Sequence, residues 1–151
     1  RFYLCGDGAV DEVRARVNEM GLSHRVAHIG WIDGRQKEEI LRSAMINVLP
    51  SYNEGLPMTI LETMARGIPN LSTPVASIPE VITDGETGLL VPPGDVGALA
   101  SALRRLILDP GLRRHISDAS FTLIGERFSL PVSVARVNAI YIALAGRKTE
   151  L

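Results

Sequence analysis

Two glutamates, Glu54 and Glu62, stand in one short stretch of the chain with seven residues between them. An ionised carboxylate only accepts hydrogen bonds, and its two oxygens can accept from two hydroxyl groups at once. A charge-assisted hydrogen bond of this kind contributes about 1.5–3 kcal/mol. The pair therefore suits the vicinal hydroxyls of sugars better than it suits phosphate, which carries the same sign of charge.

The residues between the two glutamates predict a site for a phosphate group. Gly55 permits a ligand to approach the backbone closely, and Pro57 suits the first turn of a helix, where its missing N–H is not needed. The start of a helix carries unpaired N–H groups and a partial positive charge. We expect the amides here, other than that of the proline, to bind a diphosphate along Leu56, Pro57, Met58 and Thr59. A nucleotide-sugar has the matching layout, with a central diphosphate and a sugar at each end.

An ordinary structural role for both glutamates stays open at this point. Glu62 and Arg66 are four residues apart with the glutamate first, which is the favoured order for an ion pair on a helix surface. Glu54 in turn suits a solvated loop before a helix. The residues alone do not decide between these roles and a sugar site.

The composition of the chain is that of one soluble α/β domain. Its 151 residues are 46% hydrophobic and 22% charged, which is enough for a sizeable core. The formal net charge of −1 gives no reason to expect nucleic acid or an anionic membrane as the main partner. The one cysteine, Cys5, has no internal disulfide partner, which favours a reducing compartment. No apolar run approaches the ~20 residues needed to cross a bilayer, so we expect no transmembrane segment.

Short apolar runs alternate with helical patterns along most of the chain. The predicted strands cover residues 2–5, 25–29, 45–49, 69–73 and 89–91. The predicted helices cover residues 10–20, 36–43, the stretch from Pro57 to 66, 96–108, 111–127 and a last helix ending at 145, with one helical turn at 79–82.

This alternation predicts an α/β fold, a Rossmann-like parallel sheet with helices on both faces and a helical C-terminus. Such sheets bind ligands outside the carboxyl ends of their strands. The loops at Gly6, Gly30, Ser51 and Pro74 each follow a predicted strand, so we expect all four to line one rim. We see no linker or repeat, and expect one domain over residues 1–145 with a tail at 146–151.

The central stretch resembles the signature of retaining GT-B glycosyltransferases of family 4, the glycosyl transferases group 1 type. The signature reads Ser-x-x-Glu-Gly, then Pro, then Leu-Glu-x-Met-Ala-x-Gly-x-Pro, and covers residues 51–69. Other motifs of this family lie before and after it in the expected order: Gly6-Asp7-Gly8, Ile29-Gly30-Trp31-Ile32, Pro79-Glu80-Val81-Ile82, Asp84-Gly85, Gly88-Leu89-Leu90-Val91 and Gly94-Asp95. The resemblance extends over nearly the whole chain, from residue 2 to about residue 144.

The resemblance implies a role for each part of the central stretch. The chain would be the C-terminal, donor-binding half of a hexosyltransferase-like enzyme of polysaccharide biosynthesis. Glu54 would be the catalytic residue that contacts the transferred sugar, and Glu62 would bind the ribose. Gly55 and the amides of residues 56–59 would hold the diphosphate.

The remaining motifs would complete the donor site. The glycine pair Gly6 and Gly8 follows a strand as in the family, and the backbone near Gly30 and Trp31 would border the base. Trp31 suits stacking on the base, and packing at the rim is the alternative. His28, between apolar neighbours, is interpreted as a core residue.

The implied reaction moves a sugar from a nucleotide-sugar to a glycan, lipid or small-molecule acceptor with retention of configuration. The resemblance implies neither a cofactor nor a metal, because protein cations and helix dipoles would stabilise the leaving nucleoside diphosphate. The acceptor would be bound by an N-terminal domain that this chain lacks. We use the term parent for the full-length protein of which this chain would be a part. We expect the parent to be in the cytoplasm, or peripheral at the inner face of the membrane.

The chain departs from the family pattern in three places. The phosphate-binding Arg and Lys of the family, with the first strand and helix of the domain, would lie upstream of Arg1. The common Gly-Gly before Pro-Glu is Ala76-Ser77, whose side chains would narrow the sugar pocket or mark a different donor. The usual alanine after the second glutamate is Thr63. We therefore expect the isolated chain to be inactive.

Two other functions are compatible with the same scaffold. One is a nucleotide-sugar epimerase of GT-B architecture, which needs no acceptor. The other is a non-catalytic nucleotide-binding module. The glutamate pair and the Gly-Leu-Pro turn resemble the transferase family more closely, and the sequence leaves open the donor base, the sugar and the acceptor.

Overall fold

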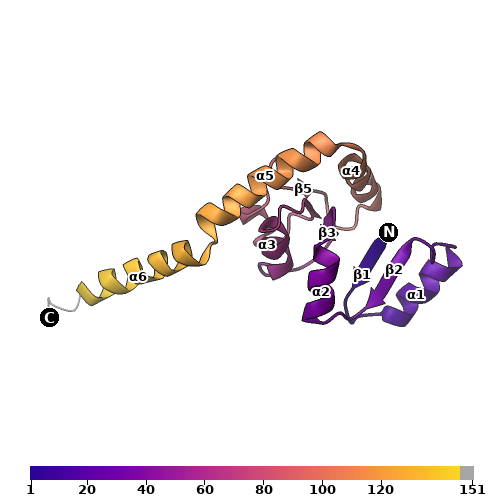
Figure 1. The fold of residues 1–151 in the computed structure, drawn as a ribbon, viewed down its shortest axis with the longest axis horizontal. Helices are drawn as coiled ribbons and strands as arrows, with labels where there is room; N and C mark the ends of the chain where they lie inside the picture. Colours follow the sequence, from indigo (N-terminus) through magenta and orange to yellow (C-terminus); the bar gives the residue numbers. More distant parts are fainter. Residues whose placement is uncertain (147–151) are drawn as a thin grey trace. The chain divides into compact units, whose positions relative to one another are not determined.

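A computed structural model describes residues 1–146 of the chain, in which strands and helices alternate (Figure 1). Residues 147–151, most of the predicted tail, lie outside the described residues. The chain divides into two compact units, Arg1–Ala44 and a second that begins at Met45. Each unit has a parallel sheet of its own.

The first unit contains a sheet of two parallel strands. β1 (Phe2–Cys5) pairs with β2 (Val26–Gly30), and α1 (Val10–Glu19) connects them. α2 (Gly34–Leu41) follows and begins with a capping box at Asp33. All four residues of β1 are exposed, although the strand is apolar. This unit therefore has little core of its own.

The second unit contains a sheet of three parallel strands in the order β3-β4-β5. Its strands are shorter than predicted, because only their central residues pair with a neighbour. In chain order its elements are β3 (Asn47–Leu49), α3 (Met58–Met64), β4 (Asn70–Ser72), the 3₁₀ turn η1 (Ile78–Glu80), β5 (Leu89–Leu90), α4 (Val96–Leu108), α5 (Pro110–Arg127) and α6 (Leu130–Gly146).

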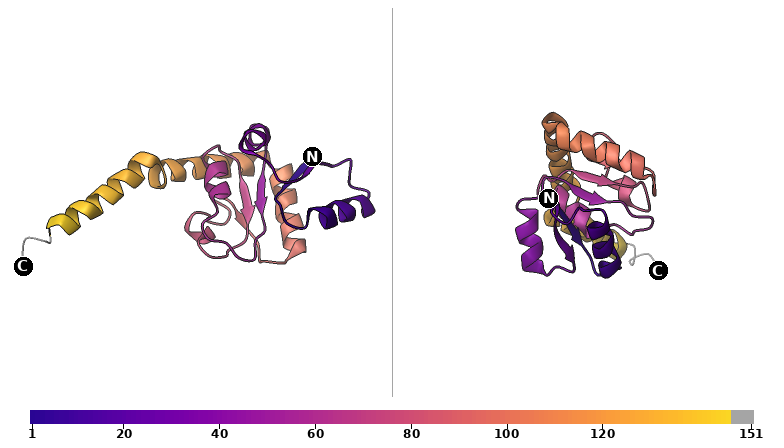
Figure 2. Two further views of the ribbon diagram at one scale, coloured as in Figure 1. Left: turned by 90° about the horizontal axis from the view of Figure 1, so that it is seen from below. Right: turned by 90° about the vertical axis from the view of Figure 1, so that its right-hand side faces the viewer.

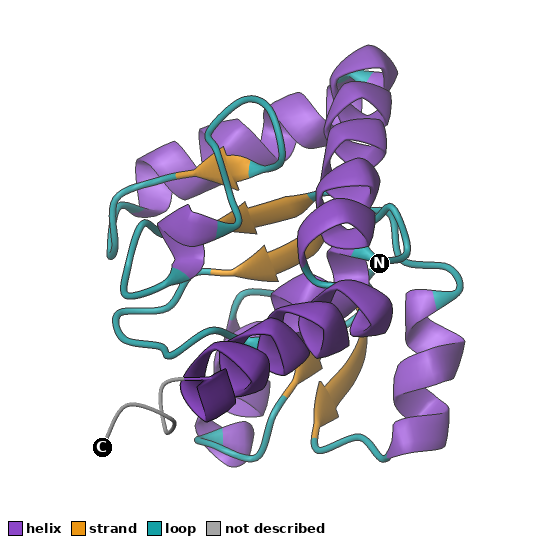
Figure 3. Cartoon of the chain, turned by 90° about the vertical axis from the view of Figure 1, so that its left-hand side faces the viewer, coloured by secondary structure: helices purple, strands orange, loops and turns teal. Residues whose placement is uncertain are grey.

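Helices cover both faces of this three-stranded sheet, as predicted (Figure 3). Leu89 belongs to an apolar cluster with Leu106 of α4 and Ile116 of α5. Its neighbour Leu90 packs against a second cluster, which includes Met64 of α3. Adjacent residues of a strand point to opposite faces, so β5 contributes to both clusters. The sheet therefore fixes where α3, the helix that carries Glu62, lies.

The predicted α/β fold with parallel strands between helices is confirmed, and the strands of the described residues pair in two sheets. A doubly wound sheet has the strand order 3-2-1-4-5-6, in which the first strand separates strands 2 and 3 from strands 4 to 6. The observed pairings, β1 with β2 and β3 with β4 with β5, match the 3-2 and 4-5-6 parts of that order. The expectation that the loops at Gly6, Gly30, Ser51 and Pro74 line one rim stays a prediction, because these loops belong to two units.

The ends of the helices show where sequence signals decide the fold. α4 has the predicted bounds, and the Asp95 side chain caps it by accepting from the N–H of Ala98 at 2.8 Å. α3 ends two residues earlier than predicted, at Met64, although Gly67 stops it as expected. Gly67 has a φ of 66° and donates its N–H to the carbonyl of Met64, which is part of a Schellman motif.

α6 follows α5 after a break at Phe128 and Ser129 (Figure 2), and its residues from 130 to 145 are exposed apart from the half-buried Val132. Its large exposed side chains are Leu130, Val134, Val137, Ile140, Tyr141, Ile142 and Leu144. By length and composition alone, the helical stretch Pro110–Ala145 qualifies to cross a membrane, and 0% of its most apolar 18-residue window is buried. Length and composition alone do not show a membrane span, and the absence of a transmembrane segment stays a prediction.

Gly88, just before β5, has no room for a side chain. A Cβ atom there would lie 2.8 Å from Ile82 Cγ2 and 3.0 Å from the Asn70 carbonyl oxygen. We expect Gly88→Ala to lower the free energy of unfolding by about 1–3 kcal/mol, because overpacking forces the neighbours to shift. Urea denaturation of the purified chain measures the change.

Gly125 in α5 provides the matched control, because a Cβ there would have no neighbour within 4 Å. Alanine is favoured over glycine in a helix by about 1 kcal/mol, so Gly125→Ala should keep or raise the stability. Equal stabilities of the two variants would contradict the tight packing at Gly88.

Candidate functional site

The loops that follow β3, β4 and β5 meet at the carboxyl ends of these strands. The Thr73 hydroxyl, after β4, donates to the Ser51 carbonyl, after β3, at 2.6 Å. The Tyr52 side chain reaches the turn after β5, since a Cβ atom on Gly94 would lie 3.0 Å from the Tyr52 hydroxyl oxygen. These contacts form one rim in the second unit, at the end of the sheet where ligands of parallel sheets bind.

Glu54 stands on this rim and is held there by the loop. It is half-buried, and the Ser51 hydroxyl donates to its Oε1 at 2.8 Å. Ser51 is in turn fixed through its carbonyl by Thr73. The carboxylate of Glu54 is therefore oriented by the protein, which a freely solvated loop acid would not be.

The turn between the two glutamates is open to solvent. Gly55 and Leu56 are exposed, as are Met58 and Thr59 at the start of α3, whereas Pro57 is half-buried. Pro57 is the N-cap of α3, and its carbonyl accepts from the N–H of Ile60 at 3.0 Å. The first N–H groups of a helix have no partner within that helix, so this turn presents amides at the rim, close in sequence to Glu54.

Glu62 lies on α3 and is half-buried. Arg66 donates to its backbone carbonyl at 3.0 Å. Glu62 and Arg66 are the two residues that the sequence also suits to an ordinary ion pair on the helix surface. This contact joins the Arg66 side chain to the backbone of Glu62. It fixes Arg66 against the end of α3, and an ion pair between the two side chains stays compatible with the structure.

A buried polar network, which sequence reasoning missed, anchors the helix that carries Glu62. Asn70 on β4 is fully buried, and its Oδ1 accepts from Asn47 Nδ2 at 2.7 Å. The hydroxyl of Thr63 lies 2.9 Å from the same oxygen. The Asn70 Nδ2 donates to the Ile68 carbonyl at 3.1 Å. The network ties α3 to β3 and β4 next to Glu62. Two residues in the sequence could have indicated this network: Asn70 inside an apolar strand, and Thr63 where the family resemblance has an alanine after the second glutamate.

The predicted site residues of the first unit form a group of their own. The N–H of Gly6 donates to the carbonyl of Gly30 at 3.0 Å, while Gly8 and Trp31 are exposed. Trp31 is 70% exposed and therefore does not pack into a core. His28 is half-buried and its Nε2 lies 3.1 Å from the Gly30 carbonyl, in agreement with a structural role.

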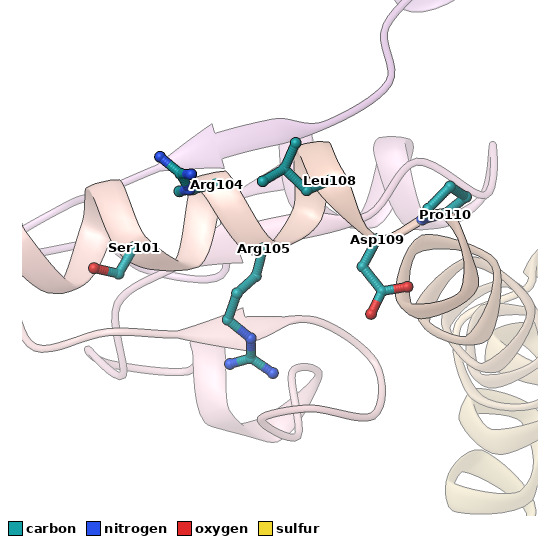
Figure 4. A pocket seen from close by; sticks show the side chains of 6 residues that line it. All are labelled: Ser101, Arg104, Arg105, Leu108, Asp109 and Pro110. Carbon is teal, nitrogen blue, oxygen red and sulfur yellow. The ribbon is translucent and has the colours of Figure 1, made fainter.

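Two cavities lie elsewhere in the described chain. The larger, about 520 Å³, is at the junction of α4 and α5 (Figure 4) and is lined by Ser101, Arg104, Arg105, Leu108, Asp109 and Pro110. Its two arginines point to different sides and do not converge on one ligand (Figure 4). The smaller, about 180 Å³, lies in the first unit beside β2. The rim that carries Glu54 has the better chemistry for a sugar, so we place the candidate site there.

Residues 1–146 contain no group of three or more His, Cys, Asp and Glu side chains arranged to hold a metal ion. Cys5 is exposed as a residue, yet the partial burial of its thiol raises the pKa of that group. A raised pKa lowers the fraction of reactive thiolate, so Cys5 is not an activated nucleophile.

The sequence of this chain matches a known protein family. The family described as glycosyl transferases group 1 matches residues 1–109. The α-D-kanosaminyltransferase of Streptomyces kanamyceticus is 30% identical over 142 residues, which cover 93% of this chain and 37% of that protein. The chain spans between 16% and 39% of the length of the curated relatives that it matches.

Solved structures share the fold. Sucrose-phosphate synthase from Thermosynechococcus elongatus superposes with a TM-score of 0.83 at 27% identity, over 96% of this chain and 38% of that one. Anabaena Alr3699/HepE in complex with UDP-glucose gives a TM-score of 0.78 at 22% identity, over 93% of this chain and 40% of that one. The family match covers well over half of the chain, and the chain belongs to the glycosyl transferases group 1 family.

Proposed function

We propose that this chain is the donor-binding domain of a retaining glycosyltransferase. The observation that carries the proposal is the pair Glu54 and Glu62 on either side of an exposed turn, in a chain of this family. Glu54 comes from the rim and Glu62 from the helix that the Asn70 network anchors. Two carboxylates flanking a turn with free amides match the two sugars and the diphosphate of a nucleotide-sugar.

Each end of the ligand has a proposed partner. Glu54 contacts the transferred sugar and acts as the catalytic residue, and Glu62 binds the ribose hydroxyls. The backbone amides of residues 56–59, with Gly55, bind the diphosphate. The UDP-glucose complex of Anabaena Alr3699/HepE, which has the same fold, supports a nucleotide-sugar as the ligand class. Gly6, Gly8, Gly30 and Trp31 of the first unit are proposed to border the donor.

The transfer itself is proposed to need no metal and no cofactor. The leaving nucleoside diphosphate would be stabilised by amides at the start of α3 and by cationic side chains of the parent. The phosphate-binding Arg and Lys expected from the family resemblance would be among them. A cytoplasmic location, or one at the inner face of the membrane, remains a prediction.

The rest of the parent is proposed to supply the acceptor site and to cover α6. A run of exposed large apolar side chains marks an interaction surface, and α6 exposes Val134, Val137 and Ile140 by more than half. The related kanosaminyltransferase has nearly two thirds of its length outside the matched region. Without these parts we expect no sugar transfer by this chain.

Replacing Glu62 tests the ribose assignment. In the full-length parent, Glu62→Ala should weaken the binding of nucleoside diphosphates about 10-fold or more, since a charge-assisted hydrogen bond is worth about 1.5–3 kcal/mol. The corresponding 2′-deoxynucleotides, which keep only the 3′-hydroxyl, should show a smaller difference in affinity between wild type and variant. Isothermal titration with UDP, GDP and their 2′-deoxy forms measures both effects. Unchanged ribonucleotide affinity would show that Glu62 does not bind the ribose.

An epimerase of GT-B architecture is the alternative enzyme. It converts the donor without an acceptor, so product analysis with donor alone distinguishes the two. The proposed transferase yields a glycosylated product only when acceptor is present. Formation of an epimeric nucleotide-sugar in the absence of acceptor would favour the epimerase.

A further inference from the structure

The loop after β3 leaves the sheet at a proline. β3 ends at Leu49, and the next residue, Pro50, has no N–H to donate to a neighbouring strand. At this point the Leu49 carbonyl accepts from the Ser72 hydroxyl at 2.8 Å. Two residues later, the Ser51 carbonyl accepts from the Thr73 hydroxyl at 2.6 Å. Two side-chain hydroxyls at the end of β4 therefore hold the chain where the backbone pairing of β3 stops.

The end of β4 is the most deeply buried part of this sheet. β4 is the central strand, and its three residues, Asn70, Leu71 and Ser72, are fully buried. Thr73, which follows them, is 1% exposed, whereas every residue of β3 is half-buried. Segments with many buried contacts open least readily. The Thr73 hydroxyl is therefore a fixed point from which the loop after β3 is held.

Ser51 connects this fixed point to Glu54. Thr73 holds the Ser51 carbonyl, and the Ser51 hydroxyl donates to Glu54 Oε1 at 2.8 Å. The loop is restrained a second time at Tyr52, because a Cβ atom on Gly94 would lie 3.0 Å from the Tyr52 hydroxyl oxygen. The bond from Ser51 uses Oε1, and a carboxylate has further lone pairs on its second oxygen with which to accept from a ligand. Two hydrogen bonds in series therefore lead from the core to the carboxylate.

We propose that Thr73 is a positioning residue for the transfer: through Ser51 it holds the Glu54 carboxylate in place while the nucleoside diphosphate leaves the sugar. This inference rests on the proposed function, because it assumes that Glu54 acts on the transferred sugar. Thr73 is buried, and it acts through Ser51 without contacting the ligand. A charge stabilises a transition state best when its direction is fixed beforehand. A misplacement of about 1 Å caused away from the chemistry can cost about 100-fold in rate.

Thr73→Val in the full-length parent removes the first of the two hydrogen bonds. Valine has nearly the shape of threonine but no hydroxyl group. We expect kcat to fall by about 10- to 100-fold, with the Kd of the nucleoside diphosphate within a few-fold of the wild-type value. Thr73→Ser keeps the hydroxyl and should keep a kcat close to that of wild type. Initial rates at saturating donor and isothermal titration with the nucleoside diphosphate measure the two quantities.

The combination of Thr73→Val with Glu54→Gln separates positioning from a purely structural role. A residue that acts through the Glu54 carboxylate loses its effect once that carboxylate is absent, so the double variant should have the kcat of Glu54→Gln alone. Thr87→Val is the matched control. Thr87 is also buried, and its hydroxyl donates to the Val81 carbonyl at 3.0 Å, before the amino end of β5 and away from the rim. This variant should keep the wild-type kcat.

Ser51→Ala breaks the second hydrogen bond and tests the same inference independently of how well Thr73→Val folds. It should lower kcat by a similar factor in the wild-type background and not at all in the Glu54→Gln background. A wild-type kcat in Thr73→Val, equal losses in Thr73→Val and Thr73→Ser, or a further loss in the double variant would overturn this inference and leave the proposed function standing. A wild-type kcat in Glu54→Gln would overturn the proposed role of Glu54 and this inference with it.

Discussion

Glu54→Gln in the full-length parent should lower kcat by about 100-fold or more while leaving the affinity for the donor within a few-fold, the range seen when one group that stabilises transition-state charge is removed. Positive charge develops on the transferred sugar as the nucleoside diphosphate leaves. An oriented carboxylate stabilises that charge, whereas an amide of the same size does not. Initial rates at saturating and limiting donor measure the separation of kcat from KM.

The structure provides the reason to expect this size of effect. Glu54 is held by the Ser51 hydroxyl at 2.8 Å and is half-buried, so its charge is presented in a fixed direction. Glu126→Gln is the control. Glu126 is exposed on α5, so this substitution removes the same charge at a position away from the rim. Equal rates for the two variants would show that Glu54 takes no part in the chemistry.

Asn70→Asp should have the largest effect on stability, lowering the free energy of unfolding at pH 7 by about 3–5 kcal/mol, as expected for an uncompensated buried charge. Asn70 is fully buried. The substitution replaces the amide that donates to the Ile68 carbonyl at 3.1 Å with an oxygen that repels it. Denaturation in urea, followed by circular dichroism, measures the loss.

The loss should depend on pH in a defined direction. Burial favours the neutral carboxyl, so the pKa of the introduced group would be raised in the folded state above the unfolded value of about 4. The destabilisation is then fully present above the folded pKa and diminishes as the pH falls towards the unfolded pKa. Asn138→Asp on the exposed α6 is the control and should change stability by less than about 0.5 kcal/mol. Equal effects of the two substitutions would contradict the buried network.

The order of the elements could be predicted from the sequence because each is marked locally. Asp95 before an apolar periodic run predicted the start of α4, which has the predicted bounds. Gly67 likewise predicted the end of α3. Strand lengths were overestimated, since pairing depends on the neighbouring strand and is not encoded in the strand itself. The division into two sheets has the same cause, because the sequence of a strand does not encode which other strand pairs with it.

The site was predictable to the extent that its chemistry lies in one continuous stretch. Glu54, Glu62 and the turn between them are close in sequence, and the structure brings Glu54 to the rim formed by the loops after β3 and β4. The Asn70 network was not predicted because its three side chains come from separate elements. The positive φ of Ala76 was also hidden, since alanine is not a signal for that conformation.

The central claim is that Glu54 binds the transferred sugar and Glu62 the ribose of one nucleotide-sugar. A crystal structure of the full-length parent with an intact nucleotide-sugar tests it most directly. We expect the Glu54 carboxylate within about 2.5–3.2 Å of a hydroxyl of the transferred sugar, the Glu62 carboxylate equally close to a ribose hydroxyl, and the diphosphate on the amides of residues 56–59. A donor bound away from this rim, or with its two sugars exchanged between the glutamates, would contradict it.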